Sequence, residues 1–579
     1  MIETDPITRE IVKNALASAA DEMAVALYRT AYSTVVRDCL DFSTSLCEAG
    51  GEMIAQGVTI PLHLGSIPYA METLFAKFGD DIEPEDVFIL NDPFDGGMHI
   101  PDIFIVKPIF WEGERVAFAV TTAHHLDLGG RLPGSSACDN TEIFQEGLRI
   151  PWLKLFRRGE ADESIFTLLR ANVRVPQMTI GDLRAQLAAC HIGERAICDL
   201  IERYGKETFT RCAADLIDYT ERLVRAEIAS WPDGSHTFTD HMDSDGVGGP
   251  PVRLQVTVTV KGDGLTADFT GSAPQVRGAL NNTLSFTASV VGLCVRSVLR
   301  EADVPNTAGM FRPLEIIAPE GTVVHGAMPA ASSMRGITGF RLVDTVFGAL
   351  AGLLPDRVLA AGEGGNSLII IGGQRPEGAP YVYYELMSGT WGGRPDRDGN
   401  DGLCNPANVA SNIPVEQAES EYPIRVERYG YVPDSGGAGQ FRGGLAVERE
   451  WRLLEGEAHL AIRSDRRQHP PYGLYGGKRG TPSNTILYHQ DGEEVLPTMV
   501  STTIKAGERV YHRQAGAGGW GAPLKRSPAA VADDVRNGKV SAEAARIHHG
   551  IVVDEASGQV DEAATGTRRR EMRSNGDAD

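Results

Sequence analysis

The stretch GGMHIPDIFIVKPIFWEGERVAFAVTTAHH, residues 96–125, contains two apolar runs on either side of a short polar turn. The runs at residues 103–110 and 116–123 are rich in β-branched and aromatic side chains, which predicts two strands. Glu112 and Gly113 suit the turn of a β-hairpin. With the turn centred there, the numbers of directly opposed residues add up to about 225 or 226, so the sequence also predicts a register.

Polar side chains gather at the open end of this hairpin. The register places Asp102 opposite His124, to within one residue, and directly opposed residues of an antiparallel pair have Cβ atoms roughly 5 Å apart. His99 enters from the glycine-rich loop just before the first strand. His125 points to the opposite face of the sheet, because side chains alternate along a strand. We therefore expect His99, Asp102 and His124 to lie close enough to share one ion.

Two imidazoles and one carboxylate that leave coordination positions vacant suit Zn²⁺, Mn²⁺ or Fe²⁺ in a catalytic role. The alternative is that these residues are ordinary hydrogen-bonded groups at the mouth of a hairpin, since HxxD is a common tetrapeptide. The spacing alone leaves both interpretations open. Four nearby carboxylates are candidates to complete a ligand set: Asp41, Asp92, Asp95 and Asp127.

Composition limits the class of protein. A chain of 579 residues is too long for one core and predicts two to four domains. The net charge of -23 argues against nucleic-acid and membrane partners, because such a surface repels phosphate backbones and anionic lipid. No apolar run approaches the length of a transmembrane helix, and the N-terminus shows no signal-peptide pattern. The eight cysteines contain no CxxC pair, which favours reduced thiols and a cytoplasmic protein.

The order of patterns along the chain predicts a mixed α and β (α+β) protein with several domains, a helical N-terminal segment, mixed sheets and a β-rich C-terminal half. A long amphipathic helix is expected to begin at Asp5 and Pro6, which suit the N-cap and the first helical position. The expected regions are an N-terminal α/β region with the metal site (1–234), a mixed sheet–helix domain (235–360), a Gly-rich β domain (361–525), a helical unit (526–560) and a disordered tail (561–579).

Other motifs carry less weight. GAGGWG, residues 516–521, matches GxGxxG, but Pro523 follows and no apolar-periodic helix begins there, so a glycine-rich turn is favoured over a dinucleotide site. The chain contains no GxxxxGK[ST] loop and no GxSxG elbow.

His63, in IPLHLGSIP, lies in a loop bounded by Gly and Pro. It is either a substrate contact or a structural hydrogen-bonding residue.

Eight motifs, taken together and in order, are similar to those of the hydantoinase B/oxoprolinase family, and the resemblance covers about residues 5–555. The motifs are RDCLDFSTSLCEAGGEMIAQG, IPLHLGSIP, LNDPFDGGMHIPD, TTAHHLDLGG, ADFTGSAPQVRGALN, NPANVASNIPVE, DSGGAGQFRGGL and GAGGWGAPLKRSPAAVADDVRNGKVSAEAA.

The resemblance implies a β-type subunit that works with a hydantoinase A-type partner, which uses ATP and Mg²⁺, in an A2B2 heterotetramer. Such complexes open cyclic amides (hydantoins, 5-oxoproline, caprolactam). The resemblance also implies a divalent metal, Zn or Mn and alternatively Fe, held by His99, Asp102 and His124 with Asp41 as the fourth ligand. The candidates for proton transfer are then His63, His125 and Asp127.

A second branch of the family carboxylates ketones such as acetone and acetophenone. We expect hydrolysis of a small cyclic amide, because subunits of the carboxylase branch tend to be longer than this chain. A third hypothesis, from a different class, is a non-catalytic scaffold for the ATP-using partner.

Overall fold

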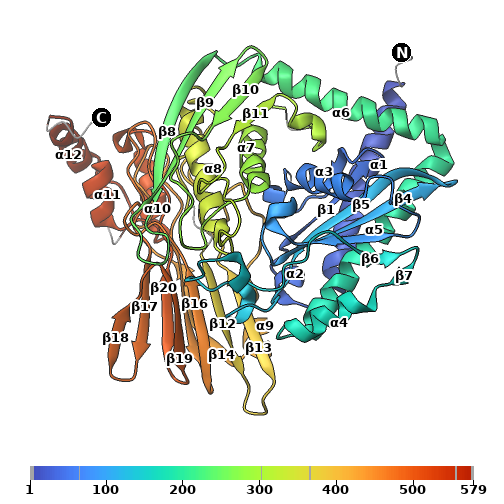
Figure 1. The fold of residues 1–579 in the computed structure, drawn as a ribbon. Helices are drawn as coiled ribbons and strands as arrows, with labels where there is room; N and C mark the ends of the chain where they lie inside the picture. The colour runs from blue at the N-terminus through green and yellow to red at the C-terminus, as the bar shows by residue number, and fades with distance from the viewer. Residues whose placement is uncertain (1–4, 64, 302, 364–366, 555–556, 575–579) are drawn as a thin grey trace.

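The computed structural model describes residues 5–63, 65–301, 303–363, 367–554 and 557–574. Over these residues, helices pack against four β-sheets, and the second half of the chain is dominated by strands (Figure 1). The predicted mixed α and β architecture is therefore confirmed. No helix in the described ranges combines the length and the apolar character needed to cross a membrane.

The first sheet carries the predicted hairpin at its centre, in the strand order β2-β1-β5-β4-β3-β6-β7. Helices α1 and α5 pack together over one face of this sheet, and α6 contacts α1 (Figure 1). The strands are β1 (Phe42–Glu48), β2 (Met53–Gln56), β3 (Val87–Leu90), β4 (Asp102–Trp111), β5 (Glu114–His124), β6 (Leu153–Arg157) and β7 (Glu160–Ala161). The helices are α1 (Pro6–Thr30), α5 (Pro176–Tyr204) and α6 (Lys206–Ile228).

Strands β4 and β5 are buried on both faces, which explains why their sequences are continuously apolar. Ile103 and Ile105 belong to the cluster under α1 and α5, whereas Phe104 and Val106 belong to the cluster on the other face. The pairing of Asp102 with His124 is the one predicted, and a bulge between Ile109 and Phe110 shifts the register by one residue near the turn.

The second sheet, in the order β11-β10-β9-β8, packs against the buried helix α8. Its strands are β8 (Gly234–Met242), β9 (Val252–Lys261), β10 (Gly264–Asp268) and β11 (Leu314–Ile317). Helix α7 (Leu284–Val298) lies against α8 (Arg335–Ala351). Shorter helices are α2 (Thr34–Arg37), α3 (Ser66–Phe78), α4 (Glu163–Asn172) and α9 (Val415–Glu421).

Two further sheets form the C-terminal half, in the orders β13-β12-β16-β19 and β14-β15-β20-β17-β18. A hydrophobic cluster that includes Ile369, Trp451 and Val510 joins them. The strands are β12 (Leu368–Gln374), β13 (Pro380–Leu386), β14 (Ile424–Tyr431), β15 (Val447–Leu453), β16 (Glu457–Arg463), β17 (Asn484–His489), β18 (Gly492–Val495), β19 (Met499–Lys505) and β20 (Arg509–Arg513).

The predicted regions correspond to changes of sheet, but they share a core. One hydrophobic cluster contains Phe104 of the first sheet, Val256 of the second and Ile370 of the third. The division of the chain into separate domains therefore stays a prediction.

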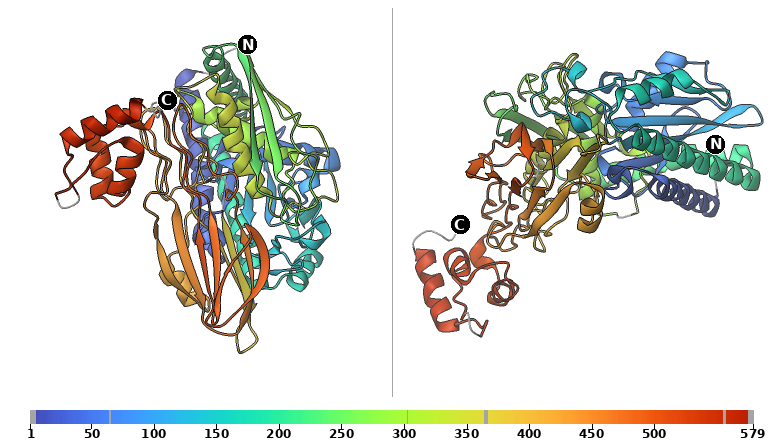
Figure 2. Two further views of the ribbon diagram at one scale, coloured as in Figure 1. Left: turned by 90° about the vertical axis from the view of Figure 1, so that its left-hand side faces the viewer. Right: turned by 90° about the horizontal axis from the view of Figure 1, so that it is seen from below.

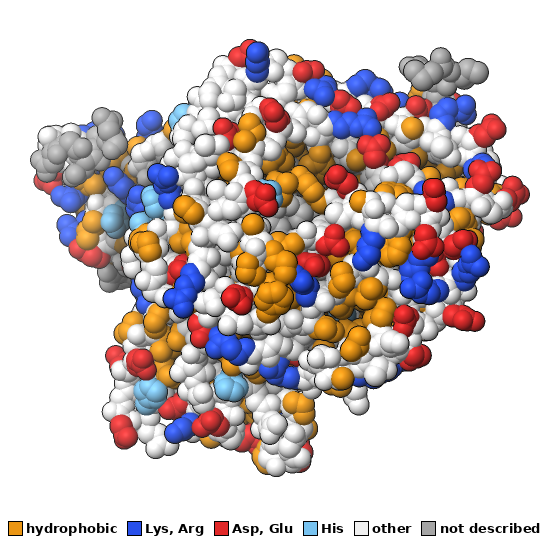
Figure 3. All heavy atoms as spheres, viewed as in Figure 1, with side chains coloured by type: hydrophobic (Ala, Val, Ile, Leu, Met, Phe, Trp, Pro, Cys, Tyr) orange, Lys and Arg blue, Asp and Glu red, His pale blue; other side chains and the backbone are white. Residues whose placement is uncertain are grey.

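On the face drawn in Figure 3, acidic and basic side chains are interspersed, with small groups of apolar side chains between them.

The glycine-rich segment at residues 516–521 is a packing element. The backbone N–H groups of Gly516, Gly518 and Gly519 donate to the backbone oxygens of Thr481, Ala361 and Lys478 at 2.9–3.0 Å. A Cβ on any of these three glycines would overlap a backbone oxygen of another loop, so this packing requires glycine. The segment is followed by a short 3-10 helix at Pro523–Lys525 rather than by the long helix of a dinucleotide fold.

The tail expected to be disordered contains a helix, which corrects that prediction. Helices α10 (Pro528–Arg536), α11 (Ala542–His549) and α12 (Glu562–Ser574) form a small unit that projects from the rest of the molecule (Figure 2). Met572 is buried, and Arg569 donates to the backbone oxygens of His549 at 3.0 Å and Arg526 at 2.7 Å. These contacts order a segment whose charged composition alone indicates disorder.

Replacement of Gly518 by Ala should destabilise the C-terminal half. The added Cβ would overlap the backbone oxygen of Tyr472, which has no room to move. We expect a loss of about 3 kcal/mol or more, seen as a fall in the apparent melting temperature of at least ~3 °C. Gly492→Ala is the matched control, because a Cβ there meets nothing within 4 Å. Equal melting temperatures for the two variants would contradict the packing role.

Candidate metal centre

His99, Asp102 and His124 come together at one end of the central hairpin. One ligand atom from each residue can be chosen so that all three lie within 4.8 Å of one another, and Nδ1 of His99 is 2.6 Å from a carboxylate oxygen of Asp102. The three residues are 5%, 1% and 2% exposed. Asp102 begins β4 and His124 ends β5, so the strand pairing brings these two side chains to the same face.

The loop before β4 is shaped to deliver His99. Gly96 has a φ of 95°, a left-handed conformation that favours glycine. A Cβ on Gly97 would lie 2.6 Å from the backbone oxygen of Asp92, so the chain turns too tightly there for a side chain. The backbone N–H of Asp102 then donates to the oxygen of His99 at 3.0 Å, which closes the turn directly into the strand.

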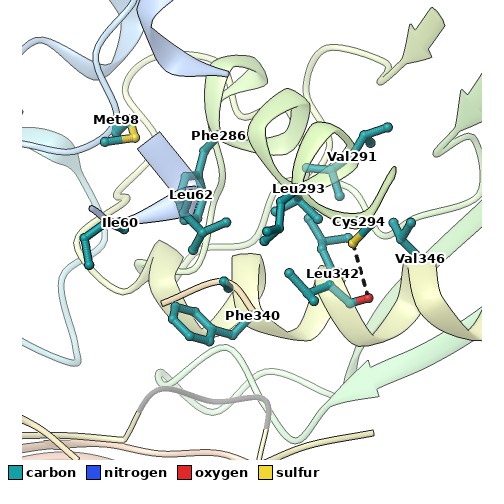
Figure 4. Packing of buried hydrophobic residues seen from close by; sticks show 14 of the residues in the cluster. Ile60, Leu62, Met98, Phe286, Val291, Leu293, Cys294, Phe340, Leu342 and Val346 are labelled. Atoms are coloured by element: carbon teal, nitrogen blue, oxygen red, sulfur yellow. Dashed lines mark hydrogen bonds between the residues drawn. The ribbon is translucent and has the colours of Figure 1, made fainter. Parts of the chain in front are cut away.

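The three residues line a cavity of about 50 Å³, which is room for a few water-sized groups. One side of the cavity is apolar, and Figure 4 shows Ile60, Leu62, Phe286 and Phe340 gathered beside α7 and α8. The polar side contains residues far apart in the chain. These are Asp41, His63, His99, Asp102, His124, Arg335, Tyr384, Asn408 and Arg463.

The environment keeps the imidazoles neutral. Burial, and then the charge of Arg335, lower the pKa of His99 to about 4. Burial also lowers the pKa of His124 well below its usual value. Burial opposes ionisation of Asp102, but His99 and Arg335 outweigh it and hold the pKa of that carboxyl below its usual range. Neutral imidazole and ionised carboxylate are the forms that bind metal ions.

His124 supplies the observation that best fits a metal ligand. Its Nε2 lies 3.0 Å from the hydroxyl of Tyr384 on β13, and its buried Nδ1 has no hydrogen-bond partner among the described residues. The tautomer that donates Nε2–H to the Tyr384 oxygen leaves a lone pair on Nδ1. Buried polar atoms are rarely left unpaired, and a metal-binding histidine is commonly oriented by a hydrogen bond at its other nitrogen.

Arg335, the first residue of α8, makes contacts within the ligand group. Its Nη2 lies 2.5 Å from Oδ2 of Asp102 and 3.0 Å from Nδ1 of His99, and its guanidinium stacks 3.9 Å from the ring centre of Phe286. The arginine thus neutralises Asp102. Because like charges repel strongly in a buried site, binding of a cation requires Arg335 to move away from these two residues.

Asp41 lines the same cavity, next to the group of three. Its backbone oxygen accepts from the backbone N–H of His124 at 3.0 Å. Burial and the charge of Asp102 raise the pKa of Asp41 to about 7. Its side chain is not part of the group of donor atoms that lie within 4.8 Å of one another. The role of Asp41 as a fourth ligand stays a prediction.

His63 also lines the cavity, and a hydrogen-bond chain orients it. Its Nδ1 lies 2.9 Å from Oγ of Ser43, and that hydroxyl donates to the backbone oxygen of Ile60 at 3.2 Å. Because the hydroxyl proton is used for Ile60, Ser43 accepts from Nδ1–H of His63. The lone pair of His63 is therefore on Nε2. Burial lowers the pKa of His63 to about 4, so the ring is neutral at pH 7.

The other two candidates for proton transfer, His125 and Asp127, do not line the cavity, and their catalytic role stays a prediction. His125 lies on the other face of the sheet, where its Nε2 is 2.9 Å from Oε1 of Gln186 in α5. Asp127 is held in a loop: it accepts from the backbone N–H groups of Gly129 and Gly134 and forms an ion pair with Arg174 at 3.0 Å. Both side chains are used to hold structure together.

Asp92 and Asp95, which were considered as additional ligands, also lie outside the cavity lining. Asp92 accepts from the backbone N–H of Phe94 at 3.0 Å and caps a short 3-10 helix. The preference of aspartate for such caps explains its place in this loop.

Three functional candidates were not identified from the sequence: Arg335, Tyr384 and Arg463. They lie more than 200 residues from the hairpin and belong to a buried helix and two strands. For the two arginines, the only signal in the sequence is an arginine within an apolar segment. Arginines that form ordinary buried ion pairs occur in the same pattern.

Comparison with known proteins places this geometry in context. The family model described as hydantoinase B/oxoprolinase matches residues 5–523. The caprolactamase subunit beta of Pseudomonas jessenii is 36% identical, over 98% of this chain and 100% of that protein. The 5-oxoprolinase 1 of Arabidopsis thaliana is 28% identical, over 90% of this chain but 42% of the longer plant protein.

Two solved structures share the fold. The crystal structure of the ATP-dependent caprolactamase from Pseudomonas jessenii superposes with a TM-score of 0.91 and 34% identity, over 98% of this chain and 99% of the matched chain. The nucleotide-free acetone carboxylase superposes with a TM-score of 0.91 and 19% identity, over 99% of this chain and 83% of the matched chain. At that identity, the second likeness concerns the fold alone.

Replacement of His99 by Ala should abolish metal binding. We expect about one divalent ion per wild-type chain and an affinity at least a hundredfold weaker in the variant, because a direct ligand matters more than the outer-shell groups whose loss costs 10–100-fold. Elemental analysis after dialysis measures this. His489→Ala is the control, since His489 is 39% exposed and pairs with Glu508 far from the cavity. A full complement of metal in the His99 variant would disprove the assignment.

Replacement of Tyr384 by Phe should weaken metal binding without abolishing it. The change removes the oxygen that lies beside Nε2 of His124 and keeps the ring. The expected loss is about 10–100-fold, measured by competition with a chromogenic chelator. Tyr381→Phe, on the same strand but outside the cavity, is the control. Equal affinities in the two variants would show that Tyr384 does not orient the ligand.

Proposed function

The chain belongs to the hydantoinase B/oxoprolinase family, and we propose that it is the metal-dependent subunit of an ATP-dependent hydrolase of cyclic amides. The observation that carries the proposal is the buried group of His99, Asp102 and His124 inside a cavity with one apolar side. Its support from the relatives is that a caprolactamase subunit aligns over nearly the whole of both chains.

We propose that a hydantoinase A-type subunit supplies the ATP chemistry, in an A2B2 complex. The name of the caprolactamase relative, a subunit beta, supports a partner subunit. The eight cysteines have free thiols, which fits a reducing compartment such as the cytoplasm.

The chemistry explains why two subunits would be required. An amide carbonyl is a poor electrophile, because resonance between nitrogen and carbonyl must be lost before water can add. In our proposal the partner transfers the γ-phosphoryl group of ATP to the amide oxygen. Water then adds to the activated carbon in this subunit. Cleavage of the ring C–N bond, with a proton going to nitrogen, leaves an acyl phosphate. A second water then hydrolyses the acyl phosphate to the carboxylate and inorganic phosphate.

In this subunit, His99, Asp102 and His124 would hold the ion, with Asp41 as a fourth ligand. The chemistry that Zn²⁺, Mn²⁺ or Fe²⁺ supplies in such a site is Lewis acidity, which eases ionisation of water near neutral pH. The apolar wall of Phe286 and Phe340 would contact the ring of the substrate and limit access of bulk water.

His63 is the group we assign to proton transfer. It lies in the cavity as a neutral imidazole, and its contact with Ser43 leaves Nε2 as a proton acceptor. A general base needs an available lone pair within reach of the attacking water. Of the three predicted candidates, His63 is the one that lines the cavity.

A ketone carboxylase subunit is the second candidate function, because the acetone carboxylase chain shares the fold. The fold does not choose between the two reactions. A non-catalytic scaffold is a third, and the metal analysis described above tests it, since a scaffold has no use for an open two-histidine, one-carboxylate site.

Co-expression with the A-type partner tests the proposal directly. We expect ATP consumption stimulated by at least one of hydantoin, 5-oxoproline and caprolactam, without any need for bicarbonate. Stoichiometric formation of the ring-opened acid, measured by chromatography, is the required product. Turnover that depends on acetone and bicarbonate together would instead assign the carboxylase reaction.

Replacement of His63 by Gln should lower kcat for ring opening by about 10²–10⁴-fold while metal content stays at the wild-type level. Ser43→Ala, which leaves the imidazole in place but removes its orienting hydroxyl, should give a smaller loss. Steady-state kinetics and elemental analysis of the same preparations provide the two readouts. Undiminished kcat in His63→Gln would exclude His63 as the base.

A further inference from the structure

The cavity contains a buried arginine without an ion pair. Six of the seven buried arginines in the described part of the chain form ion pairs with carboxylates, as expected, because an uncompensated charge is costly to bury. Arg463 is the exception. The seven are Arg335, Arg341, Arg442, Arg449, Arg463, Arg466 and Arg526.

Arg463 ends strand β16 and is 4% exposed, yet its guanidinium is nearly free of partners. One long contact is present, from Nη1 to the backbone oxygen of Ser333 at 3.4 Å, and Nε has no partner among the described residues. The two carboxylates of the cavity do not pair with it. Asp102 is bonded to Arg335, and Asp41 interacts with Arg463 only at longer range.

Asn408 supplies a second donor on the same cavity wall. Its Oδ1 accepts from the backbone N–H of Ala410 at 2.7 Å, which fixes the orientation of the amide. The side-chain NH₂ group is therefore the end left for the cavity, and no described residue accepts from it. Arg463 and Asn408 thus present N–H donors, from two distant segments, to the same cavity.

The charge of the site indicates which ligand these donors would hold. In formal charge, the two carboxyl groups that line the cavity, Asp41 and Asp102, match the two guanidiniums of Arg335 and Arg463. A divalent ion leaves two positive charges uncompensated. A phosphoryl dianion restores the balance, and the planar fork of arginine matches phosphate oxygens in geometry.

We infer that Arg463 and Asn408 form an oxyanion subsite that holds a phosphoryl group, beside the metal-binding group. The inference deepens the proposed function and rests on it: the phosphoryl group is that of the activated amide or of the inorganic phosphate released from it. Held there, the phosphoryl oxygens would anchor the substrate while its reacting carbon faces His63.

Binding of inorganic phosphate to the purified, metal-loaded chain tests the subsite without the partner, ATP or any amide. We expect saturable binding, followed by ³¹P NMR line broadening with a diamagnetic ion or by calorimetry, that weakens at least about tenfold in Arg463→Gln. Asn408→Ala should weaken it less. Arg428→Gln, at an exposed arginine on β14, is the control for general loss of charge and should bind like wild type.

The stability of the variants separates a binding role from a structural one. Removal of an unpaired buried charge should leave the apparent melting temperature of Arg463→Gln unchanged or higher, and added phosphate should raise that of wild type alone. Arg463→Lys keeps the charge but loses the fork and should bind with intermediate affinity. Equal phosphate affinity in wild type and Arg463→Gln, no saturable phosphate binding, or tighter binding of bicarbonate than of phosphate would each overturn the inference.

The complex with the partner distinguishes the two sources of the phosphoryl group. If Arg463 holds the activated amide, Arg463→Gln should consume ATP with less than one ring-opened product per ATP. If Arg463 holds released phosphate, Arg463→Gln should still form one ring-opened product per ATP, but added phosphate should no longer inhibit it. Full coupling together with undiminished phosphate inhibition would refute both. If no amide stimulates ATP consumption by the wild-type complex but phosphate still binds through Arg463, the proposed function is refuted and the inference of a phosphate subsite stands.

Discussion

The register of the β4–β5 hairpin is the constraint on which the site depends. Asp102 and His124 face each other because the two strands pair without slippage from the open end to the bulge at Ile109. A shift by one residue would turn every side chain to the other face. Two hydrophobic clusters, one on each face of the sheet, oppose such a shift. The cores on both sides therefore hold Asp102 and His124 in register.

Buried charge imposes the second constraint. Helix α8 is buried along its length, and it carries Arg335 at its start and Arg341 near its middle. Arg341 forms ion pairs with Asp465 and Asp240, which connect α8 to the C-terminal half and to the second sheet. These pairs fix the helix that presents Arg335 to Asp102. The position of Arg335 thus follows from charge pairing elsewhere in the core. A cation that binds at the site must displace Arg335 from Asp102 while these ion pairs hold α8 in place.

The same fold supports different chemistry in relatives. A caprolactamase and an acetone carboxylase chain both superpose on this protein with a TM-score of 0.91. The reaction must therefore be determined by side chains at the cavity rather than by the arrangement of sheets. The apolar wall, the orientation of His63 and the unpaired Arg463 are features of this cavity that bear on substrate choice. Each can be tested by mutation of individual side chains that line the cavity.

The local sequence predicted the helical N-terminus, the hairpin, the pairing of Asp102 with His124 and the placement of His125 on the opposite face, because these depend on patterns within about 30 neighbouring residues. It did not predict the ion pair of Asp127 with Arg174, 47 residues away, and it failed for residues 562–574 of the tail, where contacts with Arg526 and His549 order helix α12. Arg335 meets Asp102 across 233 residues, and Tyr384 meets His124 across 260. No local pattern encodes such meetings, since they result from how whole sheets and helices pack. The sequence by itself thus determined half of a cavity, the edge formed by His99, Asp102 and His124, and only the tertiary structure decided what stands opposite that edge.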